Sequence, residues 1–134
     1  MSKTIFKAGT AFLAGIMLFS TTTASLAGAQ DYEFQAVQTE IKQGAGQTVS
    51  VRLIDKRTGE NVPEAVIFTT RMDMAPEGME TMTTTVEPSA SNEPGVYTFT
   101  TNLSMEGGWR FQVAAKVQGE PETVQGEVVL KAVP

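Results

Sequence analysis

Residues 109–117 read WRFQVAAKV, and their pattern is the clearest indication of the fold. Apolar residues stand at every second position from Trp109 to Val117, with Arg110, Gln112 and Lys116 among the residues between them. A period of two is typical of a strand that turns one face toward a hydrophobic core. Because the only tryptophan of the chain heads this stripe, we expect its ring to lie between two sheets rather than to stack on a ligand.

Shorter segments with the same alternation lie on both sides of this stretch. They predict about seven strands, near residues 32–41, 47–55, 65–74, 81–87, 96–104, 109–118 and 123–132. In the third of these, one face is expected to carry Val66, Phe68, Thr70, Met72 and Met74. Glycine- and proline-containing turns separate the strands, for example at residues 43–46 and 89–95. The pattern therefore predicts an all-β fold, an immunoglobulin-like antiparallel β-sandwich.

The first 29 residues have the composition of a cleaved signal peptide. Lys3 and Lys7 precede an apolar run over residues 8–19, and residues 27–29 form an Ala-x-Ala cleavage pattern. We therefore expect a signal peptide over residues 1–29, one domain over residues 30–134, and a periplasmic or secreted location with no membrane segment after cleavage. The alternative is an uncleaved anchor, although a membrane-spanning helix needs roughly 20 apolar residues.

Charge and composition argue against several classes of function. The chain has 10 basic and 15 acidic residues, with a net charge of −5. An acidic protein repels phosphate backbones and anionic membrane surfaces, so no nucleic-acid partner is expected. Cysteine and histidine are both absent, which removes catalytic triads, thiol nucleophiles and the usual zinc ligands. The sequence predicts that the protein is not an enzyme.

Methionines form the most unusual cluster of the chain. Beyond the signal peptide there are five, of which four fall within residues 72–82. Thioether sulfur is a soft ligand that selects Cu(I) or Ag(I) over hard ions. The neighbouring carboxylates are poor ligands for Cu(I). We therefore predict a Cu(I) or Ag(I) site formed by Met72, Met74, Met79, Met82 and Met105.

Packing is the competing interpretation of the same residues. Met72 and Met74 are in phase with Val66 and Phe68, and methionine fills irregular gaps in a core well. In that case the protein is a metal-free interaction module of the cell envelope, with methionines as core or as an adaptable apolar contact surface. The sequence leaves both functions open.

The segment from Phe68 to Val117 resembles the YtkA-like domains, which are grouped with FixH-like proteins. The resemblance rests on three pieces in the same order: the methionines of residues 72–82 with Pro76, then Pro94-Gly95-x-Tyr97, then residues 105–113 with Gly-Gly before the tryptophan. This Gly-Gly is one residue longer than the family pattern. The resemblance implies an immunoglobulin-like sandwich outside the cytoplasmic membrane. It also implies an association with copper handling, with copper-transport or oxidase-assembly proteins as partners.

Overall fold

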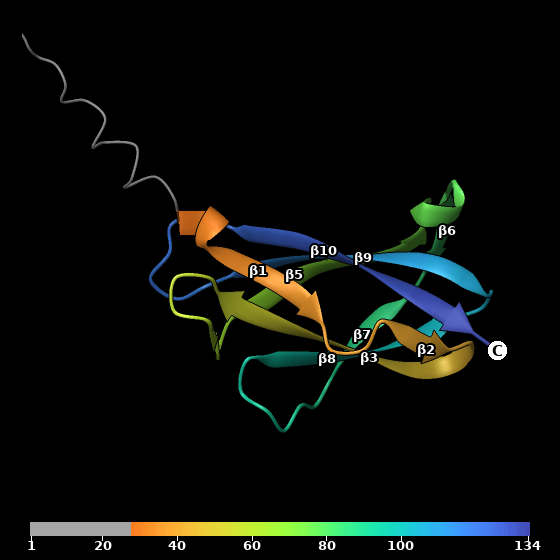
Figure 1. The fold of residues 1–134 in the computed structure, drawn as a ribbon, viewed down its shortest axis with the longest axis horizontal. Coiled ribbons are helices and arrows are strands. Elements are labelled where there is room, and N and C mark those ends of the chain that lie inside the picture. The colour runs from red at the N-terminus through yellow and green to blue at the C-terminus, as the bar shows by residue number, and fades with distance from the viewer. Residues whose placement is uncertain (1–27) are drawn as a thin grey trace, which may run out of the picture.

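The computed structural model describes residues 28–134, which form two β-sheets packed face to face (Figure 1). The first sheet has the order β1 (Tyr32–Ala36), β3 (Gly44–Asp55), β8 (Val96–Leu103), β7 (Val86–Ser89), and β4 (Glu60–Asn61) pairs with β3. The second has the order β2 (Glu40–Lys42), β10 (Val124–Val133), β9 (Gly107–Lys116), β5 (Val66–Met74), β6 (Met79–Thr84). All pairs are antiparallel except β2 with β10. The expected immunoglobulin-like sandwich is confirmed.

Short 3-10 turns are the only helical elements in this part of the chain. They are η2 (Gly28–Asp31) and η3 (Ala75–Glu77). Within residues 28–134, no helix is long and apolar enough to cross a membrane. The predicted signal peptide lies almost entirely outside the described residues.

Two of the expected strands are each divided between the two sheets. The segment expected at 32–41 forms β1 in the first sheet and β2 in the second, and the segment expected at 81–87 forms β6 and β7 in opposite sheets. Each segment lies at an edge of the sandwich, where a strand can change sheets at a bend. With the short β4, residues 28–134 therefore contain ten strands rather than the seven expected.

The core lies between the sheets and is centred on β9. Trp109 is fully buried, as its sequence position predicts, and its Nε1–H donates a hydrogen bond of 3.0 Å to the Met105 carbonyl oxygen. The rings of Phe99 and Phe111 meet edge to face, with centroids 5.2 Å apart. This arrangement joins the two sheets through β8 and β9, because aromatic pairs favour such contacts.

A β-bulge changes which residues of β5 face the core. Between Ile67 and Thr69 the pairing with β9 shifts by one residue, so Phe68 has no partner opposite it. The shift reverses which residues face the core on the N-terminal side of the bulge. Val66 and Phe68 are therefore 62% and 52% exposed, and their expected place on the core face is wrong. Ile67 packs against the core in their place.

Candidate methionine site

A tight hairpin at one end of the sandwich carries four of the five methionines. Strand β5 ends at Met74, η3 makes the turn, and β6 returns from Met79. Gly78 closes the turn with a φ of 75°, and its N–H donates to the Ala75 carbonyl oxygen at 2.8 Å. A positive φ is easily reached by glycine alone among the common residues. The hairpin places Met74 directly opposite Met79, where the Cβ atoms of a cross-strand pair are about 5 Å apart.

The five methionines differ strongly in their access to solvent. Met72 and Met74 are fully buried, and Met72 lies opposite Phe111. Met79 and Met82 are half-buried and pack against the core. Met105, in the turn between β8 and β9, is 40% exposed. Solvent therefore reaches Met79, Met82 and Met105, whereas Met72 has the surroundings of an ordinary core residue.

The turn that carries Met105 packs against the hairpin. The Gly108 N–H donates to Glu77 Oε2 at 2.7 Å. A Cβ atom added to Gly108 would lie only 2.8 Å from Cβ of Pro76, so the backbone of β9 approaches η3 more closely than a side chain permits. Both glycines before Trp109 touch the η3 segment in this way. The β8–β9 turn and the methionine hairpin therefore meet at the same end of the sandwich.

Asp73 lies between the two buried methionines in sequence but points to the opposite face of β5. It is fully buried, and its Oδ2 accepts hydrogen bonds from Arg71 Nε at 2.7 Å and Arg110 Nη2 at 2.8 Å. Its Oδ1 accepts the Ala75 N–H at 3.0 Å. Burial alone raises the pKa of Asp73, but the bonds from Arg110, Ala75 and Arg71 outweigh it and lower the pKa to about 2.

This ion pair network was missed by sequence reasoning, which considered the carboxylates near the methionines only as poor ligands for Cu(I). The alternation of β5 carried part of the signal, because a residue between two inward methionines must face outward. Its partners could not be assigned, since Arg110 comes from another strand. Both oxygens of the buried Asp73 carboxylate accept hydrogen bonds, and two of the three donors are arginines, so the carboxylate is already paired with positive charge.

The chemistry of this end of the sandwich is therefore that of thioethers. Among residues 28–134, no group of three or more carboxylate, histidine or cysteine side chains is placed to hold a metal ion. The predicted site residues Met74 and Met79 are brought together by the hairpin, and Met82 lies on the same strand as Met79. Met105 comes from the adjoining turn.

Comparison with known proteins gives one family. The sequence model described as YtkA-like matches residues 26–114, more than half of the chain. Among solved structures, the chain is similar to the Lin-41 filamin domain, with 17% identity and a TM-score of 0.42 over 73% of this chain and 93% of that one. It is also similar to the ZirS C-terminal domain, with 12% identity and a TM-score of 0.43 over 98% and 87%. No curated protein matches the chain significantly.

Proposed function

This chain belongs to the YtkA-like family, and from that premise we propose that it is an exported β-sandwich protein that binds Cu(I) or Ag(I) through methionine side chains. The observation that carries the proposal is the cross-strand pair of Met74 and Met79 at a hairpin that solvent reaches. Thioether sulfur is a ligand that soft monovalent ions prefer. Among residues 28–134, the carboxylates form no group of three or more that could hold a harder ion.

Solvent exposure and cross-strand pairing together separate the proposed ligands from the packing residues. Met79, Met82 and Met105 are reached from solvent and are the proposed entry ligands, with Met74 beneath them. Met72 is enclosed opposite Phe111, so its proposed role is to support the hairpin by packing. We propose that this site, which is open on one side, binds its ion weakly and releases it. The proposed partners, which the family resemblance implies, are copper-transport or oxidase-assembly proteins that receive the ion.

Competition for Cu(I) against a colorimetric chelator under reducing conditions tests this proposal. We expect the protein to withdraw Cu(I) from the chelator and to ignore Zn(II), which prefers nitrogen and thiolate ligands. Changing Met79, Met82 or Met105 to Leu should each weaken binding by about tenfold, whereas Met72→Leu should leave it unchanged. Leucine keeps apolar volume at a cost usually under about 1.5 kcal/mol, so each variant should remain folded in a denaturant melt.

The pH dependence of the Cu(I) affinity tests the same proposal. Thioethers carry no proton to displace, so affinity should be nearly equal at neutral and mildly acidic pH, unlike that of histidine or cysteine sites. Oxidation of the methionines to sulfoxides should abolish binding. A protein that takes up no Cu(I), or variants that all bind like the wild type, would refute the metal site.

A metal-free interaction module is the second candidate. The full burial of Met72 and Met74 favours it, because packing alone accounts for their position. On this view the half-buried Met79 and Met82 and the exposed Met105 provide an adaptable apolar contact for a partner. An absence of Cu(I) uptake, together with loss of a partner's binding in Met79→Leu or Met105→Leu, would favour this function over the first.

A further inference from the structure

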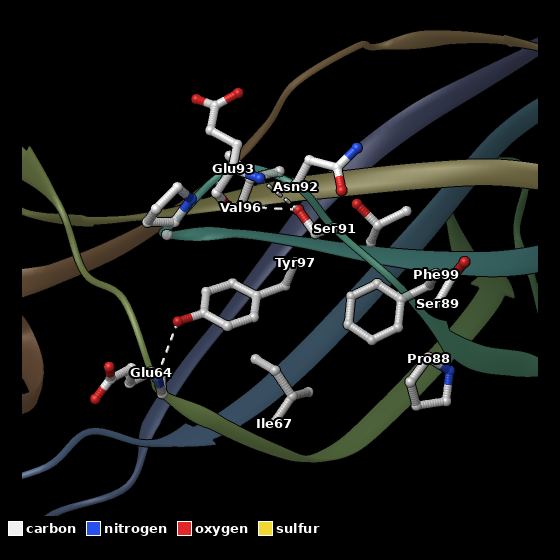
Figure 2. Close-up of a pocket in the computed structure, with 14 residues that line it drawn as sticks. Glu64, Ile67, Pro88, Ser89, Ser91, Asn92, Glu93, Val96, Tyr97 and Phe99 are labelled. Atoms are coloured by element: carbon white, nitrogen blue, oxygen red, sulfur yellow. Dashed lines mark hydrogen bonds between the residues drawn. The ribbon is translucent and has the colours of Figure 1, made fainter.

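A second candidate site lies elsewhere on β5, at its N-terminal end. Here a cavity of about 500 Å³ opens between the start of β5, strand β8 and the loop of residues 89–95. Figure 2 shows Ile67, Tyr97, Phe99 and Pro88 around this space, so its floor is apolar and partly aromatic. None of the five methionines lines it.

Hydrogen bonds hold one wall of the cavity in place. The Tyr97 hydroxyl donates to the Val62 carbonyl oxygen at 2.7 Å and accepts the Ala65 N–H at 2.9 Å. These two bonds flank Glu64, which has a φ of 63° and is the only residue other than glycine with a positive φ in the described chain. A left-handed conformation is unfavourable for such a residue and persists where its surroundings enforce it.

The opposite wall is held in a similar way. Asn61 Nδ2 donates to the Pro94 carbonyl oxygen at 3.3 Å, and the Leu53 N–H donates to the Gly95 carbonyl oxygen at 3.0 Å. Gly95 is packed so closely that an added Cβ would overlap Cβ of Asn61. Both walls are therefore formed before any ligand arrives, which lowers the entropic cost of binding.

One rim of the cavity is a strand edge without a partner. Strand β5 pairs with β9 along most of its length, but β6 covers only residues 72–74 of its other side. Within residues 28–134, the edge of residues 66–71 is therefore unpaired. An unpaired edge is a template for an added strand. Beside it lie the exposed Val66 and Phe68. Across the cavity, Pro88 lacks an N–H and makes β7 the poorer template.

The charges around the cavity indicate the kind of occupant. Glu64 and Glu93 line it, and no basic residue does. Arg52 approaches Glu93 only at 3.9 Å, and the Glu93 side chain is largely exposed, so this pair neutralises little of the charge. A second copy of this chain, with its net charge of −5, would be repelled. The complementary occupant is a segment that carries lysine or arginine.

We propose that this cavity binds an extended segment of a partner protein. The segment adds as a strand to the free edge of β5 and places an apolar side chain against Ile67, Tyr97 and Phe99. Its lysine or arginine residues lie beside Glu64 and Glu93. The backbone edge supplies affinity, and the cavity and its acidic rim supply selectivity. The site is independent of the methionines and does not rest on metal binding.

Selection of peptides from a random library displayed on phage tests the proposal with the purified protein as target. Enriched peptides should share an alternating apolar pattern with at least one lysine or arginine. Synthetic copies should bind in calorimetry, and in two-dimensional NMR they should shift the amide signals of residues 66–71 and 95–99. Raising the salt concentration should weaken binding, because part of the attraction is between exposed charges.

Three variants identify the site. Ser91→Trp, which places a large ring at the lining of the cavity, should weaken peptide binding at least about tenfold, whereas Ser104→Trp, at an exposed position in the β8–β9 turn, should not. Glu64→Gln combined with Glu93→Gln should weaken it about threefold and reduce its salt dependence. Failure to enrich any peptide, equal binding by Ser91→Trp, or a dimer in sedimentation that Ser91→Trp dissociates would each overturn the proposal.

Discussion

The single carboxylate of Asp73 joins three separate parts of the chain at the end of the sandwich that carries the methionines. It contacts Arg71 on its own strand, Arg110 on β9, and the backbone N–H of Ala75 at the start of η3. A buried carboxylate is costly unless it is paired and hydrogen-bonded. Its three bonds therefore determine the path of the chain where β5 gives way to the turn that presents Met79.

The lowered pKa of Asp73 predicts a pH-dependent stability. Its pKa is about 2 in the folded protein and about 3.9 in an unfolded chain. The carboxylate therefore stabilises the fold fully above about pH 4, and this contribution is lost as the pH falls toward 2. Asp73→Asn should lower the free energy of unfolding by about 1–3 kcal/mol at neutral pH, and the gap to the wild type should close between pH 4 and pH 2.

Urea unfolding at several pH values measures this gap. Glu106→Gln removes a carboxylate from an exposed turn and shows how much any change of net charge contributes. A gap that stays constant down to pH 2 would mean that the network acts through packing and not through the ionised carboxylate.

At the scale of elements, the contact between η3 and β9 depends on the absence of a side chain at one position. Gly108→Ala would place a Cβ 2.8 Å from Cβ of Pro76 and 3.4 Å from Glu77 Oε2. Either β9 or the turn must shift, and overpacking of this kind costs about 1–3 kcal/mol. We expect a lower denaturant midpoint and shifted NMR signals in residues 75–82. Glu77→Gln, which retains an oxygen acceptor, should leave both nearly unchanged; equal effects in the two variants would contradict the steric explanation.

The strands show which parts of the fold can be predicted from the sequence alone. The alternation of residues 109–117 predicts β9 and the burial of Trp109 because nothing interrupts its period. The same reasoning misplaces Val66 and Phe68, since the bulge that follows Ile67 depends on pairing with β9 and leaves no mark in local composition. The division of residues 32–41 and 81–87 between sheets is likewise a property of tertiary pairing.

The candidate site was predictable to a similar degree. Clustering and spacing indicate that Met72, Met74, Met79 and Met82 belong to one region, and the hairpin brings Met74 and Met79 together. The solvent exposure of each methionine depends on the path of β6. Three residues of β6, between Met79 and Thr83, have no partners on β5, so the strand bulges there. The cavity beside Tyr97 joins β5, β8 and two loops, so no single stretch of sequence predicts it.

On the scale of the whole molecule, the start of the sandwich fits the predicted export signal. Strand β1 begins at Tyr32, two residues beyond the start expected after cleavage. Removal of residues 1–29 would therefore leave every strand intact. Intact-mass measurement of the protein from the cell envelope should show a chain that begins at Gln30. A full-length product in the membrane fraction would instead indicate an uncleaved anchor.

The parallel pairing of β2 with β10 determines how the sandwich responds to a pulling force. Residues 40–42 run beside residues 131–133 in the same direction, and the chain enters and leaves the sandwich at opposite ends (Figure 1). Tension between these two ends pulls β2 and β10 past each other along their length. It therefore loads the hydrogen bonds of this patch together, in shear, instead of peeling them apart one at a time. In a domain tethered at both ends, this three-pair ladder would therefore resist extension more strongly than an antiparallel ladder of the same length that is peeled open.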